Sequence, residues 1–415
     1  MSAETQNIET FRAQGVLRAL DVHLARTLGR ISGVTDHLVL LGAASASRAK
    51  GAGHVCLQLR TFDDQVRGEE IKVGLVDWPD AGTWRARLQA CTELVRDSAS
   101  ERRTPLVLEG EHLYLDRYWG YQQRLVKQVR GRIGQGPSDI DEAWLAGTLT
   151  RLFPLAEDAK ELQKKAAEMA YRSRFAIITG GPGTGKTTTI KRLLALLIED
   201  ARRRGETDPR VVLMAPTGKA SARMKESIQA QDTHVPLNAS DEVVAAFPKG
   251  ASTIHRALGW TPKHRTRFKR NADSPLAADV VIVDEASMVD QAMMTKVFEA
   301  VAPGARLILL GDADQLKSIE SGAVLGDLVE GLGDEGVVKL EYAHRFGADS
   351  GVGALSRAIN RGALDTVRAY LAGERTEDPN IARYDELTWL PLTEQDSLQR
   401  LKEVIKTTLR KRIIK

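Results

Sequence analysis

A glycine-rich segment at residues 180–187 has the residue types and the spacing of a phosphate-binding loop. It reads G-G-P-G-T-G-K-T, which fits the P-loop pattern G-x-x-x-x-G-K-[ST]. Glycines let the backbone turn so that successive N–H groups face phosphate oxygens, and a following helix adds the positive end of its dipole. Lys186 is expected to reach the β- and γ-phosphates, and the Thr187 hydroxyl is expected to bind Mg²⁺. The residues predicted to hold the nucleotide in this segment are Gly180, Gly181, Pro182, Gly183, Thr184, Gly185, Lys186, Thr187 and Thr188.

The sequence on either side of this loop predicts the elements that the motif requires. Residues 175–179 form an apolar run that is typical of a buried strand. Ile190, Leu193, Leu194 and Leu197 fall at helical spacing behind the loop. A chance glycine-rich turn is the alternative, but it does not account for a strand, a helix, a lysine and a threonine all in their places.

A second apolar strand, residues 280–283, ends in the adjacent carboxylates Asp284 and Glu285. Beside a bound nucleotide, Asp284 is expected to hold Mg²⁺ through water and Glu285 to polarise the attacking water as a general base. Two neighbouring negative charges at the end of a buried strand are costly without a cation. Packing alone therefore gives no reason for this pair.

A third apolar strand, residues 306–310, leads into G-D-A-D-Q, which ends at Gln315. Ligands of open α/β sheets lie in the crevice at the carboxyl ends of the strands, so Gln315 is expected to contact the γ-phosphate. Arg345, further along the chain, is suited to stabilise charge in the transition state. Taken by itself, Arg345 is equally compatible with an ordinary surface position.

Four other stretches carry residues suited to nucleic acid. Residues 216–222 and 252–256 each open a helix with small hydroxyl side chains and a basic residue, which suits contacts to a phosphate backbone. Residues 263–270 place basic side chains around Phe268, which fits a single strand or, equally, a solvated loop. Residues 117–121 are the densest aromatic cluster, either a binding platform or a buried seam between domains.

Composition limits the class of protein. The 415 residues are 42% hydrophobic and 27% charged, which is ordinary for a globular chain of two or three domains. A net charge of +4 permits nucleic-acid binding without arguing for it. Cys56 and Cys91 exclude a disulfide framework, the polar N-terminus is not a signal peptide, and no apolar run reaches the ~20 residues of a membrane helix. We therefore expect a cytoplasmic protein with no membrane contact.

Six motifs in this order resemble those of the superfamily-one helicases, and most closely those of the RecD family, the alpha subunits of exodeoxyribonuclease V. They are GGPGTGKTTT at 180–189, APTGKASARM at 215–224, STIHRALG at 252–259, VVIVDEASMVD at 280–290, GDADQLKSIESGAVLGDL at 311–328 and YAHRFGADSGVGAL at 342–355. The resemblance reaches the first region through GHVCLQL at 53–59 and LYLDRYWGYQQRL at 113–125. It therefore covers nearly the whole chain, although the helix-hairpin-helix extension of the related stand-alone helicases is not found.

The resemblance implies an α/β fold with three parts. They are a smaller, mainly helical domain at 1–135 that docks on a partner, a first RecA-like P-loop motor domain at 140–345 with a parallel sheet flanked by helices, and the beginning of a second, incomplete motor domain at 346–415. Gln163 matches the glutamine with which the family contacts adenine. The DNA-contacting positions that it implies are Pro216, Thr217, Lys219, Ser221, Thr253 and His255.

The resemblance also implies an activity, ATP and Mg²⁺ as cofactors, and partners. These are ATP-driven 5′-to-3′ movement along single-stranded DNA at a duplex end, and a heterotrimer with RecB- and RecC-type subunits that serves recombinational repair. No separate carboxylate cluster for a nuclease metal is visible, so DNA cleavage is expected in a partner subunit. A P-loop ATPase with a substrate other than DNA, and a non-catalytic assembly subunit, remain the alternative functions.

One departure concerns the C-terminal part of the family pattern. The TVHKSQG-like and TRA-like motifs of a second motor domain are not found after residue 350. ATP hydrolysis in this class takes place between two motor domains, with an arginine supplied across the cleft. We therefore expect a truncated member of the family that binds ATP–Mg²⁺ and hydrolyses it weakly when alone.

Overall fold

The computed structural model describes residues 8–62, 78–154, 158–230, 237–315, 324–340 and 351–372. It divides into two compact units, one made of residues 1–181 and 185–340 and the other of residues 182–184 and 341–415. The first unit holds a small N-terminal core and a larger core around a parallel sheet. Arg345 and the basic stretch at 401–415 lie outside the described residues. Within the described part of the chain, no helix combines the length and the apolar character that crossing a bilayer requires.

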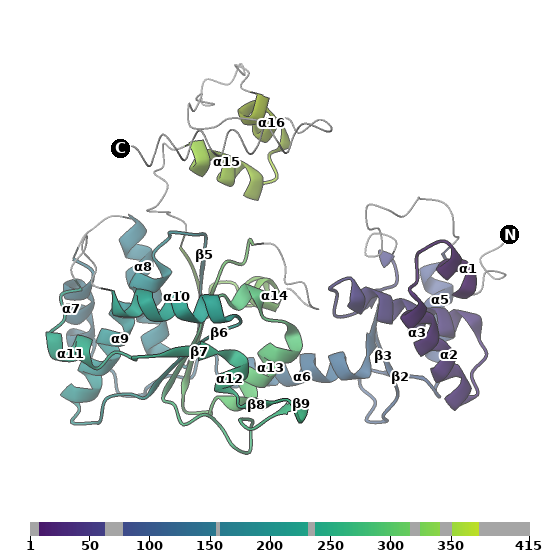
Figure 1. Ribbon diagram of the computed structural model, residues 1–415, viewed down its shortest axis with the longest axis horizontal. Helices are drawn as coiled ribbons and strands as arrows, with labels where there is room; N and C mark the ends of the chain where they lie inside the picture. The colour runs from purple at the N-terminus through teal and green to yellow at the C-terminus, as the bar shows by residue number, and fades with distance from the viewer. Residues whose placement is uncertain are drawn as a thin grey trace. The chain divides into compact units, whose positions relative to one another are not determined.

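The N-terminal region combines helices with a small sheet. Its elements are α1 (Ile8–Ala13), α2 (Ala19–Ser32), α3 (His37–Gly51), β1 (Leu57–Gln58), α5 (Ala81–Ala90), β2 (Val95–Asp97), β3 (Leu106–Glu109), β4 (His112–Leu115) and α6 (Asp116–Arg130). The strand order is β1-β4-β3-β2 (Figure 1). The apolar runs at 106–108 and 113–115, separated by Glu109-Gly110-Glu111, predict a hairpin. It is confirmed, because β3 and β4 pair antiparallel from Leu106–Leu115 to Glu109–His112 around Gly110, whose φ is +59°. The mainly helical region therefore also contains a four-stranded sheet.

Helix α3 is the central element of this N-terminal core. Its first turn is capped by Asp36, whose carboxylate accepts from the backbone N–H groups of Leu38 and Val39. Its apolar residues are buried against α2 and α5, and the indole nitrogen of Trp84 donates to the carbonyl oxygen of Leu38 at 2.8 Å. Apolar and polar residues alternate at 53–59, a pattern typical of a strand. Only Leu57 and Gln58 pair with β4, so the strand β1 is two residues long.

The larger core surrounds a six-stranded parallel sheet. Its strands are β5 (Phe175–Gly180), β6 (Val211–Ala215), β7 (Ala251–Thr253), β10 (Val280–Val283), β11 (Arg306–Gly311) and β12 (Val337–Leu340), in the order β12-β5-β11-β10-β6-β7. The surrounding helices are α7 (Glu142–Leu152), α8 (Asp158–Arg172), α9 (Lys186–Arg203), α10 (Gly218–Gln229), α11 (Asp241–Ala245), α12 (Ile254–Ala257), η2 (Ala286–Met288), α13 (Gln291–Ala300) and α14 (Val324–Leu332). All the predicted strands are present, and residues 140–172, whose sequence pattern is helical, contain α7 and α8.

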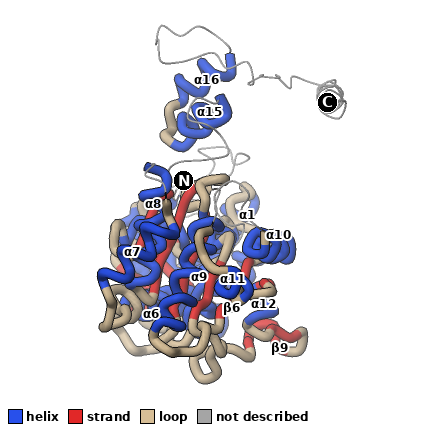
Figure 2. The backbone as a smooth tube through the Cα atoms, turned by 90° about the vertical axis from the view of Figure 1, so that its left-hand side faces the viewer, coloured by secondary structure: helices blue, strands red, loops and turns tan. Residues whose placement is uncertain are grey.

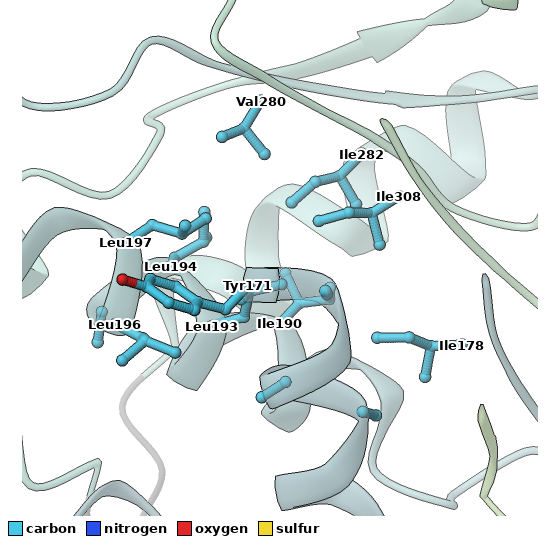
Figure 3. Close-up of a cluster of buried hydrophobic side chains, with 14 of the residues drawn as sticks. Tyr171, Ile178, Ile190, Leu193, Leu194, Leu196, Leu197, Val280, Ile282 and Ile308 are labelled. Carbon is cyan, nitrogen blue, oxygen red and sulfur yellow. The ribbon is translucent and has the colours of Figure 1, made fainter. Parts of the chain in front are cut away.

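Successive side chains of the strands enter two different cores, because strand residues alternate between the faces of a sheet. In β10, Val280 and Ile282 pack on the side of α9, whereas Val281 and Val283 pack on the side of α13. Figure 3 shows the first core, in which Leu193 and Leu194 of α9 lie among strand residues such as Ile282. Helices thus cover both faces of the sheet (Figure 2), and the predicted RecA-like α/β fold class is confirmed.

Two open alternatives now have a structural answer. Residues 263–270 are not a loop, since β8 (Trp260–Thr261) and β9 (His264–Phe268) form a two-stranded antiparallel hairpin. The aromatic cluster at 117–121 lies on α6, where Trp119 and Tyr121 are buried, which favours the buried seam over a platform. In the second unit, α15 (Gly351–Asn360) and α16 (Leu364–Ala372) form the helices expected there.

Candidate nucleotide-binding site

The segment between β5 and α9 has the backbone geometry of a phosphate loop. Gly183 and Gly185 have φ values of +82° and +90°, a left-handed conformation that favours glycine. Gly185 is also the N-cap of α9. The N–H groups of the first helical turn, which have no acceptor within the helix, therefore face the loop. Strand, loop and helix therefore occur in the arrangement that the sequence predicted, and they suit the oxygens of a triphosphate.

Lys186, the first residue of α9, lies over the start of the loop. Its ammonium donates to the carbonyl oxygens of Gly180 and, at 3.0 Å, of Gly181. Burial lowers the pKa of Lys186, while the nearby charges of Asp312, Asp284 and Glu285 act in the opposite direction. One half-buried cation thus lies among the charges of three carboxylates at the carboxyl edge of the sheet. Thr187 and Thr188, the next two residues of α9, are partly buried.

The carboxylate pair follows β10 directly. The backbone N–H of Asp284 donates to the carbonyl oxygen of Met214 on the neighbouring strand at 2.9 Å, which fixes where the strand ends. Burial raises the pKa of the Asp284 carboxyl above its ordinary value, and the negative charge of Glu285 raises it further. The hydrogen bond from the backbone N–H of Glu285 and the positive charge of Lys186 lower this pKa but do not outweigh burial. A buried carboxylate beside a cation suits a Mg²⁺ ion held partly by phosphate oxygens.

Glu285 is one of two non-glycine residues with positive φ in the described parts of the chain, at +52°. A glutamate in this conformation costs of the order of 1 kcal/mol, and such strain is typically retained at functional sites. Here the turn directs the chain away from β10 into η2, so that Glu285 stays at the sheet edge beside Asp284. The geometry fits the general-base role predicted for Glu285.

The chain that follows β11 completes this edge. The backbone N–H of Ala313 donates to the hydroxyl of Thr179 at 3.0 Å, tying the segment to the end of β5. Gln315 is exposed and accepts from the hydroxyl of Ser287 at 3.3 Å. A cavity of about 450 Å³ is lined by Ser287, Asp312, Ala313, Asp314, Gln315, Leu325, Gly326, Asp327, Val329 and Glu330. Sequence reasoning did not single out Asp312, although its place immediately after a buried strand was the available signal.

Gln163, predicted to contact adenine, lies on α8 and is only 2% exposed. Its amide nitrogen packs against the last P-loop glycine, since a Cβ built at Gly185 would lie 2.2 Å from it. Its amide oxygen accepts from Arg192 at 3.4 Å. The structure thus brings Gln163 to the phosphate loop, and its role toward the base stays a prediction.

The residues predicted to contact DNA lie at the carboxyl ends of the adjacent parallel strands β6 and β7. Thr217 caps α10 and Thr253 caps α12, so each hydroxyl accepts from its own helix. Lys219 and His255 are exposed, whereas Ser221 is buried and donates to the carbonyl oxygen of Gly218. Lys219 and His255 therefore offer exposed side chains, the His255 ring lying beside Trp260 and Phe268, whereas Ser221 serves its own helix.

Two family models match the chain. The model described as "RecBCD enzyme subunit RecD, N-terminal domain" matches residues 13–114, and the AAA domain model matches residues 163–321. The second match begins at Gln163 and includes the P-loop, the carboxylate pair and Gln315. A solved Pif1 helicase from Candida albicans has a TM-score of 0.30 and 18% identity over 55% of this chain and 49% of that one. That score is too low to support a conclusion.

Several curated relatives match most of the chain. The "RecBCD enzyme subunit RecD" of Mycolicibacterium smegmatis is 39% identical over 94% of this chain and 64% of its own length. The protein of the same name from Haemophilus influenzae is 33% identical over 79% and 57%. The "ATP-dependent RecD2 DNA helicase" of Deinococcus radiodurans is 31% identical over 66% and 34%. The chain thus spans less than two thirds of the length of these relatives, and over most of its own length it is similar to proteins named as RecD subunits.

Proposed function

We propose that this chain binds ATP–Mg²⁺ and acts as the ATP-driven, 5′-to-3′ DNA helicase subunit of a RecBCD-type exodeoxyribonuclease. The observation that carries the proposal is the sheet geometry: the glycine loop with Lys186 follows β5, and Asp284, Glu285 and Asp312 follow β10 and β11 at the same carboxyl edge. A cation and carboxylates gathered beside a glycine loop are what positioning a triphosphate and a divalent ion requires. The names of the relatives support the choice of DNA as the substrate.

The proposed roles follow from position. Lys186 and the N–H groups at the start of α9 would bind the phosphates. Thr187 and Asp284 would hold Mg²⁺, whose positive charge would offset the negative charge of the phosphates. Glu285 orients and deprotonates the attacking water, because it lies beside Asp284 at the end of β10. Gln315 contacts the γ-phosphate from the neighbouring strand. Arg345, which lies outside the described residues, is proposed to stabilise transition-state charge.

DNA is proposed to run across the ends of β6 and β7. Lys219 and His255 present exposed side chains there, and the capped starts of α10 and α12 add helix N-termini. Lys219→Ala is expected to weaken single-strand binding and to reduce its salt dependence, which a nucleotide-driven enzyme with another substrate would not show.

The partner assignment is part of the proposal. The match of residues 13–114 to the RecD N-terminal model supports docking by this region onto RecB- and RecC-type subunits. The complex is proposed to act at double-strand ends in recombinational repair, in the cytoplasm, with the nuclease centre in a partner. Nuclease activity of the purified chain that survives Asp284→Ala would contradict that placement.

The decisive experiment separates a motor from an assembly subunit. Lys186→Ala in the assembled complex is expected to abolish unwinding along the strand that this subunit follows while leaving assembly intact. Loss of assembly, or unchanged unwinding, contradicts the proposal. The 415-residue polypeptide by itself is expected to hydrolyse ATP slowly, and single-turnover hydrolysis at helicase-like rates with saturating single-stranded DNA would reject that part.

A further inference from the structure

Arg192 is a buried cation next to the phosphate loop with no role in the chemistry described so far. It lies on α9, six residues after Lys186, and only 1% of it is exposed. Its guanidinium lies 4.9 Å from the centre of the Phe153 ring at the end of α7. Burying a charged side chain is costly, so a cation held this way is expected to do something that an apolar residue could not.

Gln163 is a polar partner of Arg192. The guanidinium donates to the amide oxygen of Gln163 at 3.4 Å, across the packed pair α8 and α9 (Figure 1). This contact sets the orientation of the Gln163 amide, because its oxygen faces the guanidinium and its NH₂ group faces away from it. The amide of Gln163 is thus oriented by a residue of the helix that begins in the P-loop.

The other end of the amide meets the loop itself. A Cβ atom at Gly185 would lie only 2.2 Å from the amide nitrogen of Gln163, so the amide occupies the space beside this glycine. Gly185 is the N-cap of α9, and its φ of +90° sets the direction in which the first helical N–H groups point. A side chain pressed against this glycine therefore acts on the part of the site that faces phosphate, rather than on the base alone.

We propose that Arg192 is a positioning residue of the nucleotide site and that it acts through Gln163 on Gly185, holding the phosphate loop in the conformation that binds a triphosphate. The ring of Phe153 supports the cation from the other side. The inference rests on the proposed nucleotide binding, and it assigns Gln163 an effect on phosphate affinity that does not depend on an adenine base.

Base-free tripolyphosphate with Mg²⁺ is the probe that tests this inference. We expect Arg192→Met and Gln163→Met each to weaken binding of both tripolyphosphate and ATP by about tenfold, as measured by calorimetry, since each loses one hydrogen bond of a charged group. Because the two side chains act in one chain of contacts, the double variant is expected to lose about tenfold rather than a hundredfold. The thermal unfolding midpoint is followed in parallel.

Arg203→Met is the matched control. Arg203 lies on the same helix, with its guanidinium 4.7 Å from the centre of the Trp144 ring, but it pairs with Asp141 and Asp200 instead of Gln163. This control is expected to leave tripolyphosphate affinity unchanged. Arg192→Lys keeps a buried cation that can donate, so it is expected to bind tripolyphosphate more tightly than Arg192→Met does. If Arg192→Met does not fold, Arg192→Lys and Gln163→Met together test the inference.

The outcomes are distinguishable. A wild-type chain that binds neither ligand rejects the proposed function and the inference together. If the wild type binds both, and Gln163→Met loses affinity for ATP but not for tripolyphosphate, Gln163 reads the base and the inference alone fails. Additive losses in the double variant, or an equal loss in Arg203→Met, also overturn it.

Discussion

The hydroxyl of Thr295 lies between two backbone carbonyl oxygens, that of Tyr121 at 3.2 Å and that of Gln291 in its own helix at 2.8 Å. Thr295 lies on α13, which begins shortly after the carboxylate pair, and Tyr121 lies on α6, which continues directly from β4 of the N-terminal sheet. Arg124 and Glu299 join the same two helices at 2.8 Å. The helix that leads out of the N-terminal region is therefore packed onto the helix that follows Asp284 and Glu285.

The end of α6 offers a test of how much this junction stabilises the protein. Arg132, just beyond α6, is 3% exposed and donates to the carbonyl oxygens of Phe298, Val301 and Ala302 at the end of α13. Arg132→Met removes this donor from all three carbonyls, of which only that of Ala302 has a further donor in the described part of the chain, the backbone N–H of Ala305. We expect the free energy of unfolding to fall by about 3 kcal/mol. Urea denaturation followed by circular dichroism measures the change.

Arg124→Met is the control for that variant. Its ion pair with Glu299 is partly exposed and is expected to contribute at most about 1 kcal/mol. Equal losses in the two variants would contradict the view that the buried guanidinium, rather than the surface pair, secures α6 on α13.

The features that could be predicted from the sequence are those that depend on residues close together in the chain. The strand before Lys186 and the strand before Asp284 could be predicted because apolar runs and the glycine loop are local patterns. That parallel strands end at one edge then predicted that these residues approach each other, and β5 and β10 indeed flank β11 in one parallel sheet. The hairpin at residues 106–115 was equally local.

Non-local packing was beyond the same reasoning. Nothing in the sequence placed Gln163 against Gly185 or gave it Arg192 as a donor, because the packing of α8 on α9 decides which faces meet. The basic run at 263–270 did not predict a strand, since a hairpin of this length depends on its partner β8.

A second prediction concerns hydrolysis. Glu285→Gln keeps the shape of the side chain but removes its ability to accept a proton. We expect ATP affinity to stay within about twofold, and phosphate release in the assembled complex to slow by about 10²- to 10⁴-fold, the usual contribution of a positioned base. Rapid-quench measurement of a single turnover checks this, and a variant that loses ATP binding together with turnover would argue that Glu285 is a binding group instead.

Cysteine reactivity supplies a third prediction. Burial raises the pKa of the Cys56 thiol from 9.0 to about 11. The thiolate is the reactive form, so at pH 8 the folded chain should react with iodoacetamide at Cys56 about 100-fold more slowly than the chain unfolded in urea. Peptide mass spectrometry of a time course gives both rates. Equal rates in the two states would show that Cys56 is accessible and not desolvated.

Asp21 gives a fourth prediction, on the pH dependence of the N-terminal core. Its carboxylate is fully buried and accepts from Arg18 at 2.8 Å and from the Ser47 hydroxyl at 2.7 Å. Burial by itself raises the pKa of Asp21, but the hydrogen bonds from Arg18 and Ser47 outweigh it, and the net pKa is below its ordinary value. The folded state therefore binds the Asp21 proton more weakly than the unfolded state does.

It follows that Asp21 stabilises the fold above the ordinary carboxyl pKa, and that this stabilisation is lost as the pH falls through the lowered folded-state pKa. Asp21→Asn is expected to lower the free energy of unfolding by about 2 kcal/mol at pH 7. The difference from the wild type should shrink below about pH 4. Urea midpoints followed by tryptophan fluorescence, to which the buried Trp84 of the same core contributes, measure it, with the exposed Glu101→Gln as control. A difference that grows on acidification would mean that Asp21 is protonated in the folded protein.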